Sequence, residues 1–98
     1  MLNLREKNIK MKTIFITGAT SGIGKATAET FAKQGHRLII CGRRKEVLEQ
    51  LQIELSNITE VYSLVFDVRN QEEVENAINS LPEEWKNIDV LVNNAGNA

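Results

Sequence analysis

Apolar residues are distributed along this chain in short continuous runs, separated by longer stretches with helical periodicity. The runs at residues 13–17, 37–41, 61–66 and 88–92 are rich in aliphatic and β-branched residues, which is typical of strands covered on both faces. Each of the three intervening segments repeats small or apolar residues every three to four positions, as a helix with one buried side does. The pattern therefore predicts the element order βαβαβαβ.

Local signals delimit the three predicted helices. The first covers residues 23–34 and is stopped by Gly35, which favours the left-handed conformation that ends many helices. The second covers residues 46–55. The third follows Asn70, which has a glutamate three positions later as in a capping box, and is ended by Pro82. The small or apolar positions at helical spacing are Ile23, Ala26, Thr27, Phe31 and Ala32, then Val47, Leu48, Leu51 and Leu55, and finally Val74, Ala77, Ile78 and Leu81.

The topology follows from this alternation. Strands separated by single helices imply parallel pairing through right-handed crossovers. We therefore predict half of a doubly wound α/β sheet with the spatial strand order 3-2-1-4. Residues 1–10 are interpreted as an N-terminal tail without the features of an export signal, and residues 11–98 as one partial domain.

Composition narrows the classes of function. With 42% hydrophobic and 26% charged residues among 98, the chain resembles an ordinary globular domain, and it has no apolar segment of bilayer-spanning length. A formal net charge of −1 argues against nucleic-acid or lipid-surface binding. The single cysteine, Cys41, is expected to be a buried reduced thiol, which suits the cytoplasm. His36 is expected to be exposed, and no His or Cys cluster indicates a metal site.

A glycine-rich loop follows the first predicted strand and ends where the first helix begins. In the sequence Thr-Gly-Ala-Thr-Ser-Gly-Ile-Gly, Gly18 allows a tight turn, Gly22 lets the backbone approach a pyrophosphate, and Gly24 permits close packing of the helix. Free N–H groups and the helix dipole attract an anion at this point, and Ser21 can add a hydroxyl donor. The alternative is that these glycines merely form a tight turn.

Two arginines stand where many dinucleotide-binding units carry an acidic residue, at the end of the second strand. A carboxylate there accepts hydrogen bonds from the adenosine ribose, whereas Arg43 and Arg44 can bind a 2′-phosphate. Basic charge at a helix N-terminus is slightly unfavourable unless an anion compensates it. The pair therefore favours NADP over NAD, and the alternative is a solvated pair that opens the second helix.

Polar residues also follow the third and fourth predicted strands. Asp67 and Val68 offer a short acceptor side chain and a backbone amide to an adenine edge, although Asp67 could instead cap a turn. The segment Asn-Asn-Ala-Gly at residues 93–96 suits contact with a ribose and leaves room for a nicotinamide, although it could also be an ordinary turn.

Together these motifs resemble the short-chain dehydrogenase/reductase family over residues 12–96. Residues 67–70 with residues 81–96 resemble in particular its NADP-dependent serine and 3-hydroxy acid dehydrogenases. The resemblance implies a Rossmann-type fold, NADP as cofactor, and hydride transfer with an alcohol or carbonyl substrate that could be a 3-hydroxy acid or serine-like. The implied cofactor-binding residues are Gly18, Thr20, Ser21, Gly22, Ile23, Gly24, Arg43, Arg44, Asp67, Val68, Asn94, Ala95 and Gly96.

The catalytic serine, tyrosine and lysine of that family have no counterparts in this chain. Tyr62 is followed four positions later by Phe66 rather than by lysine, and it precedes residues 93–96 instead of following them. We therefore expect the 98-residue chain to be an inactive cofactor-binding half of an enzyme. The alternatives are a non-catalytic dinucleotide-binding module and a nonfunctional remnant. We also expect the bare edge of the fourth strand to leave the chain either poorly stable or self-associated through that edge.

Overall fold

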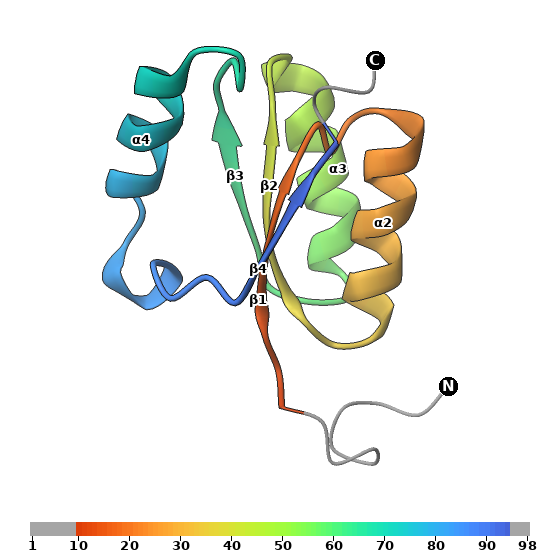
Figure 1. Ribbon diagram of the computed structural model, residues 1–98. Coiled ribbons are helices and arrows are strands. Elements are labelled where there is room, and N and C mark those ends of the chain that lie inside the picture. The colour runs from red at the N-terminus through yellow and green to blue at the C-terminus, as the bar shows by residue number, and fades with distance from the viewer. Residues whose placement is uncertain (1–9, 95–98) are drawn as a thin grey trace.

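Four parallel strands form one sheet in the order β3-β2-β1-β4, as the sequence pattern predicts (Figure 1). The computed structural model describes residues 10–94, so that most of the predicted tail lies outside the described residues. The strands are β1 (Thr13–Thr17), β2 (Arg37–Gly42), β3 (Val61–Val65) and β4 (Val90–Asn93). Because β1 and β2 have a paired strand on each side and helices over the sheet, they are almost entirely buried.

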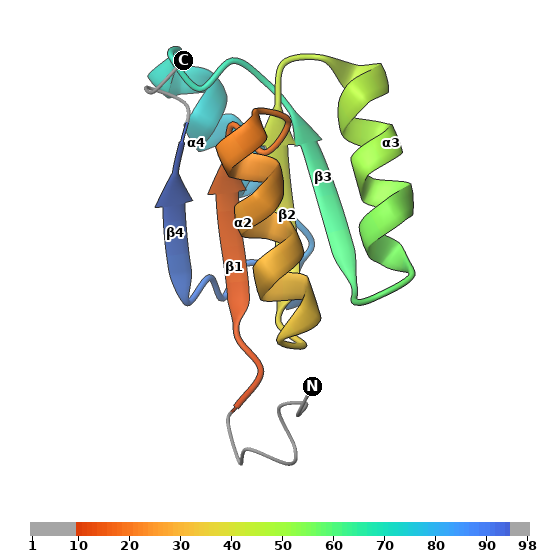
Figure 2. The ribbon, with the colours of Figure 1, turned by 90° about the vertical axis from the view of Figure 1, so that its right-hand side faces the viewer.

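Helices cover both faces of this sheet (Figure 2). The helical segments are α2 (Gly22–Lys33), α3 (Lys45–Ser56), α4 (Gln71–Asn79) and the short 3-10 segment η1 (Glu83–Trp85). The helices α2 and α3 lie on one face, and α4 and η1 lie on the other. This two-sided cover is the doubly wound α/β arrangement expected from single-helix crossovers.

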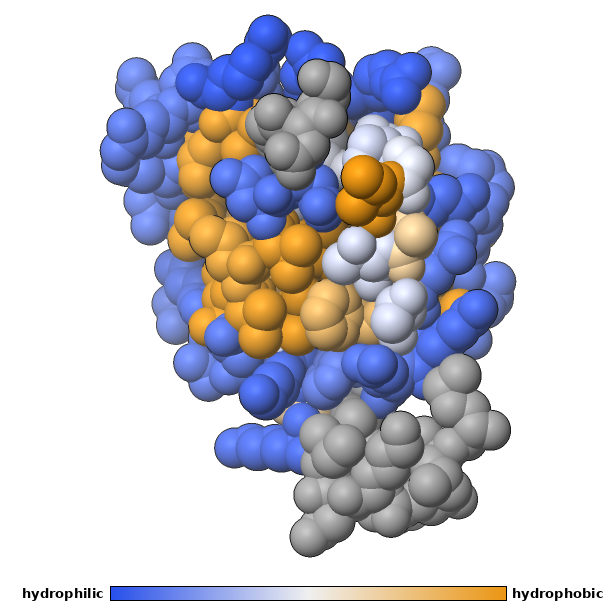
Figure 3. Space-filling view, turned by 45° about the vertical axis from the view of Figure 1, so that its right-hand side comes forward, coloured by the Kyte–Doolittle hydropathy of each residue, from blue (hydrophilic) through white to orange (hydrophobic). Residues whose placement is uncertain are grey.

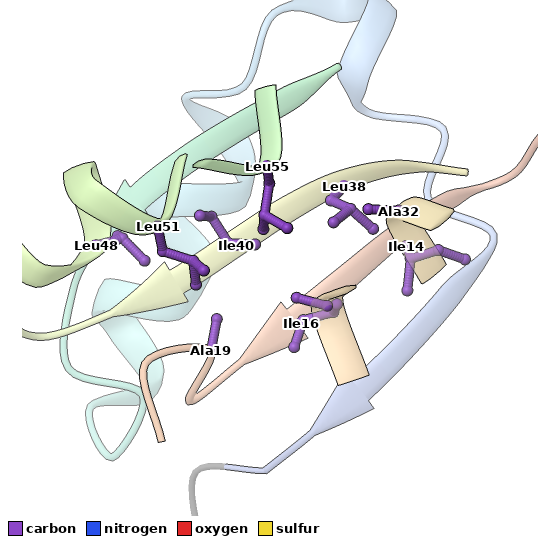
Figure 4. Close-up of a cluster of buried hydrophobic side chains, with 10 residues drawn as sticks. Ile14, Ile16, Ala19, Ala32, Leu38, Ile40, Leu48, Leu51 and Leu55 are labelled. Carbon is purple, nitrogen blue, oxygen red and sulfur yellow. The ribbon is translucent and has the colours of Figure 1, made fainter. Parts of the chain in front are cut away.

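The larger core lies between the sheet and the two helices α2 and α3 (Figure 4). Alternate residues of the central strands point to this face because successive side chains of a strand project to opposite sides. The labelled side chains of this cluster are Ile14, Ile16, Ala19, Ala32, Leu38, Ile40, Leu48, Leu51 and Leu55. Cys41 points to the opposite face and is buried, which confirms that prediction.

The buried side of α2 differs in part from the predicted one, of which Ala32 is buried and Phe31 is partly buried against the core. Gly24, Ala28 and Ala32 are buried at i, i+4 and i+8, whereas Ile23 is 68% exposed and Ala26 is exposed. Small residues allow the helix axis to approach the sheet closely, so they take the covered side even though larger apolar residues are present nearby. In α3 the predicted stripe is correct except for Val47, which is 40% exposed.

The cap of α4 is confirmed, but its end is not. Asn70 Oδ1 accepts a hydrogen bond from Glu73 N at 3.2 Å, while Asn70 N donates to Asp67 O at 3.0 Å, so only one half of the capping box forms. The helix ends at Asn79, before Pro82 is reached. Leu81 therefore lies beyond the helix, where it is 3% exposed in the core under η1.

His36 is buried, so the expectation of an exposed imidazole is wrong. Its Nδ1 accepts a hydrogen bond from Lys12 N at 3.0 Å, and its ring lies edge-on to Phe31 with centroids 6.0 Å apart. Gly35 has φ 89°, as predicted for a left-handed helix stop. This sharp turn brings His36 back against the end of α2 and the start of β1.

The described sheet has β3 at one edge and β4 at the other, and β4 pairs with β1 alone among residues 10–94. Figure 3 views the molecule from this side and shows a broad apolar area bordered by polar residues. Leu91 is 65% exposed in this strand, and Val90 and Val92 are half-buried.

Candidate functional site

A cleft of about 310 Å³ lies across the carboxyl ends of the strands. It is lined by the last residue of β1, the end of β2, and the residues that follow β3 and β4. The lining residues are Thr17, Gly18, Thr20, Ser21, Cys41, Gly42, Arg43, Arg44, Phe66, Asp67, Val68, Arg69 and Asn94. In open α/β sheets this crevice, where the strand order reverses, is the usual ligand site.

The glycine loop has the backbone conformation that its sequence predicts. Gly18 has φ 61°, a left-handed value that favours glycine. The loop is then fixed to the neighbouring strand, because Ala19 N donates to Cys41 O at 3.0 Å. A Cβ on Gly24 would collide with the carbonyl of Gly18, whereas one on Gly22 would meet nothing within 4 Å. The close packing therefore occurs at Gly24, and open space lies beside Gly22.

The N-terminus of α2 has the electrostatic character of an anion site. Ser21 Oγ accepts from Gly24 N at 3.0 Å and donates to Gly18 O at 2.8 Å, so this hydroxyl caps the helix. Its proton is therefore occupied within the loop rather than free for a ligand. The first turn contains no acidic residue, and the leading N–H groups of a helix lack intrahelical acceptors.

The end of β2 presents positive charge to the cleft. Arg43 and Arg44 are both exposed and both line the cleft. Arg44 is the N-cap residue of α3, but its side chain makes no capping hydrogen bond. No carboxylate among the lining residues comes from β2, and Asp67 is the one acidic residue in the described lining.

Asp67 forms an ion pair with Arg69, a residue that sequence reasoning did not select. Arg69 Nη2 donates to Asp67 Oδ2 at 2.8 Å, and Arg69 Nε donates to Oδ1 at 3.1 Å. Arg69 N also donates to Oδ1, so Asp67 does cap a turn. These bonds from Arg69, with the charge of Arg43 nearby, lower the pKa of Asp67 to about 2.

Thr17 joins the ends of β1 and β4, and it too was missed. Its Oγ1 donates to Asn93 Oδ1 at 2.8 Å and accepts from Asn94 N at 3.2 Å. Asn94 Nδ2 is buried and has no hydrogen-bond partner within residues 10–94. A buried amide group without a partner at the cleft is a candidate donor to a ligand. The signal for Thr17 was its place as the last residue of a buried strand.

The structure therefore brings eight of the predicted site residues into one cleft. These are Gly18, Thr20, Ser21, Arg43, Arg44, Asp67, Val68 and Asn94. Gly22, Ile23 and Gly24 adjoin the cleft at the start of α2 without being among its lining residues, and Gly22 and Ile23 instead line a shallow groove on the outer side of that helix. Ala95 and Gly96 lie outside the described residues.

Residues 10–94 contain no group of three or more His, Cys, Asp or Glu residues able to hold a metal ion. Within the same range, no helix has the length and apolar character needed to span a membrane.

Known proteins with a similar sequence include the NADP-dependent 3-hydroxy acid dehydrogenase YdfG of Escherichia coli, which is 47% identical over 83 residues. A serine 3-dehydrogenase of Rhizobium radiobacter is 48% identical over 84 residues. These alignments cover 85% and 86% of this chain but 33% of each relative. The chain thus spans about a third of the length of the curated relatives that it matches.

Solved structures of dehydrogenases and reductases are also similar to this chain. An L-sorbose reductase from Gluconobacter frateurii, complexed with NADPH and L-sorbose, superposes with a TM-score of 0.82 at 36% identity, covering 90% of this chain and 34% of the reductase. The serine dehydrogenase of Escherichia coli superposes with a TM-score of 0.71 at 43% identity, covering 81% and 35%. Residues 12–98 match the family described as short chain dehydrogenase. This chain therefore belongs to the short-chain dehydrogenase family.

Proposed function

We propose that this chain forms the NADP(H)-binding part of an oxidoreductase that acts on an alcohol or carbonyl group of a small molecule. The observation that carries the proposal is the cleft. The N-terminus of α2, which has no acidic residue in its first turn, adjoins the Arg43 and Arg44 pair there. A dinucleotide with a 2′-phosphate has negative charge at two separate places, and the cleft has a matching donor group for each.

The cleft residues fit the parts of NADP in turn. The N–H groups at the start of α2 would bind the pyrophosphate. The open space beside Gly22 would let the pyrophosphate come close to the backbone. Arg43 and Arg44 would bind the 2′-phosphate, and Asp67 with the Val68 amide would meet the adenine. The unpartnered Asn94 Nδ2 would donate to the ribose on the nicotinamide side. When bound, the cofactor supplies the C4 position that gives or takes a hydride.

For the substrate we propose a 3-hydroxy acid or a serine-like compound. The support is the similarity to relatives named 3-hydroxy acid dehydrogenase and serine 3-dehydrogenase. Oxidation of such an alcohol to a carbonyl would need a base to take the hydroxyl proton, while the bound cofactor would supply the hydride acceptor. The base and the substrate contacts would come from residues beyond this chain, since no tyrosine here is followed four positions later by lysine.

A non-catalytic dinucleotide-binding module is the second candidate, because the described cleft residues by themselves account for cofactor binding alone. The DNA sequence after the codon for Ala98 distinguishes the two candidates. An open frame that continues into a Tyr-x-x-x-Lys motif, with NADP-dependent oxidation of a 3-hydroxy acid by the encoded protein, supports the enzyme. A stop codon at that point supports the module. For either candidate we propose the cytoplasm, because the unpaired thiol of Cys41 suits a reducing compartment.

Cofactor binding is tested by titrating the chain with NADP+ and NAD+ and measuring the rise in unfolding temperature, because a ligand that binds the folded state alone stabilises it. We expect NADP+ to stabilise the chain more than NAD+. Replacing both arginines, Arg43→Gln with Arg44→Gln, should weaken NADP+ binding roughly tenfold to a hundredfold, the worth of one or two charge-assisted hydrogen bonds.

The matched control is Lys45→Gln, which removes one adjacent positive charge from a residue that does not line the cleft. This variant should keep the preference for NADP+. Equal stabilisation by the two dinucleotides, or an equal loss in the control, would contradict the assignment of the arginine pair to the 2′-phosphate.

A further inference from the structure

Arg69 holds both carboxylate oxygens of Asp67 in a fixed geometry at the mouth of the cleft. Asp67 Oδ1 accepts two hydrogen bonds from Arg69, one from its N and one from its Nε, and Oδ2 accepts one from Nη2. Each carboxylate oxygen has about two lone pairs. Three of about four acceptor positions are therefore used, and one on Oδ2 remains for a ligand.

This pairing changes what Asp67 can offer an anionic ligand. A carboxylate beside Arg43 and Arg44 would repel the phosphates that those arginines are proposed to bind. Because the Arg69 guanidinium lies 2.8 Å from Asp67 Oδ2, it offsets that negative charge. The side chain of Arg69 is 72% exposed, and both residues line the cleft, so the pair is accessible to a ligand.

The donor and acceptor pattern of this strand end matches one class of purine. Adenine presents an amino donor at C6 beside an acceptor nitrogen at N1, which complements a fixed carboxylate next to the N–H of Val68. A 6-oxopurine presents the reverse pattern, with an acceptor at C6 and a donor at N1. A site built to receive a donor rejects an analogue that lacks it, because its own polar group is then left unpaired.

We propose that Arg69 is a positioning residue for base recognition, which fixes the remaining lone pair of Asp67 toward the 6-amino group of adenine and so selects adenine over 6-oxopurine dinucleotides. The proposal rests on the proposed function, because it assumes that the adenosine end of a dinucleotide occupies this part of the cleft. It assigns to Arg69 an effect on base selectivity that is separate from the phosphate binding of Arg43 and Arg44.

The test compares the affinities of the whole chain for NADP+ and for its hypoxanthine analogue, by calorimetric titration. The two ligands carry identical phosphates, so the ratio of their dissociation constants isolates the base. We expect the unmodified chain to favour NADP+, and Arg69→Gln to reduce that ratio by about tenfold, the value of one hydrogen bond to a charged group. Arg69→Lys keeps the charge but loses the two-point geometry, so it should also lose most of the selectivity.

Arg43→Gln is the matched comparison, because it removes an arginine of the same cleft. It should weaken both ligands by the same factor and leave their ratio unchanged, whereas Arg69→Gln should change the ratio. Unfolding curves for each variant report whether it is folded, and the high exposure of Arg69 makes a large loss of stability unexpected.

The outcomes separate the two proposals. Failure of the unmodified chain to bind either ligand would overturn the proposed function and this inference together. Binding with the expected preference for NADP+, but with a ratio unchanged in Arg69→Gln and Arg69→Lys, would overturn the role of Arg69 alone. Equal binding of the two bases by the unmodified chain would overturn base recognition by Asp67 while leaving phosphate binding intact.

Discussion

The first turn of α2 packs directly on the preceding loop, with the Cα of Gly24 against the carbonyl group of Gly18. No side chain fits between them, and the atom that would have to move is a backbone oxygen rather than a flexible side-chain end. Gly18 itself is held in a left-handed conformation. The start of the helix and the turn that leads to it are therefore fixed as one unit beside the cleft.

Gly24→Ala should destabilise the chain by about 1–3 kcal/mol, the usual cost of forcing an extra methyl into a packed site. Gly22→Ala is the control, because its added methyl meets no atom within 4 Å. It should leave the free energy of unfolding nearly unchanged and yet weaken NADP+ binding, since it fills the space proposed for the pyrophosphate. Urea denaturation and cofactor titration of both variants measure these effects. Equal stability losses in the two variants would contradict the packing argument.

Thr17→Val removes the hydroxyl that joins the ends of β1 and β4 while keeping the shape of the side chain. It leaves Asn94 N without the acceptor Thr17 Oγ1, which should cost about 1–3 kcal/mol of stability and weaken cofactor binding. Thr17→Ser keeps the hydroxyl and should lose much less. The measurement is urea denaturation together with NADP+ titration. A loss in Thr17→Val that does not exceed the loss in Thr17→Ser would contradict the importance of the hydrogen bond.

His36 should make the stability of the chain depend on pH. Burial and the charge of Lys12 lower its pKa, against an opposing effect of Asp89, and its Nδ1 can accept from Lys12 N in the neutral form alone. A pKa that is lower in the folded state than in the unfolded state means that the unfolded chain binds protons more readily. Stability is therefore complete above the ordinary histidine pKa of about 6.5 and decreases as the pH falls below it.

The measurement is the urea midpoint at about pH 7.5 and pH 5.5, a range that lies above the titration of Asp67 in both states. His36→Gln can still offer an acceptor oxygen but cannot be protonated, so its midpoint should change less than that of the unmodified chain. The chain has one histidine, which makes the assignment direct. An equal pH dependence in the variant would exclude His36 as the source.

Self-association through β4 is expected because this edge is unpaired in the described sheet and its neighbourhood is apolar (Figure 3). Leu91→Lys should weaken association roughly tenfold, since it removes one exposed leucine and adds charge. Ile53→Lys is the control, because Ile53 is similarly exposed, at 62%, but lies on α3. Sedimentation at several concentrations measures both. A concentration-independent monomer, or an equal effect of the control, would contradict this use of the edge.

The sequence by itself determined the elements, their order and the chemistry gathered at the strand ends. Apolar runs such as residues 13–17 and the cap at Asn70 depend on nearby residues, so they can be recognised without knowing what packs against them. Parallel topology then followed from the spacing of strands and helices. This reasoning predicted the cleft and most of its residues, because the carboxyl ends of parallel strands share one edge of a sheet.

The tertiary structure decided which side of α2 is covered and which side chains meet across the sheet. The covered side of α2 is the one with Gly24 and Ala28, because the sheet accepts a close helix there, and local periodicity does not contain that information. His36 is buried by a contact with Lys12, 24 positions away, and Thr17 meets Asn94 across 77 positions. Even the Asp67 and Arg69 pair, two positions apart, depends on the direction in which the turn after β3 points the two side chains.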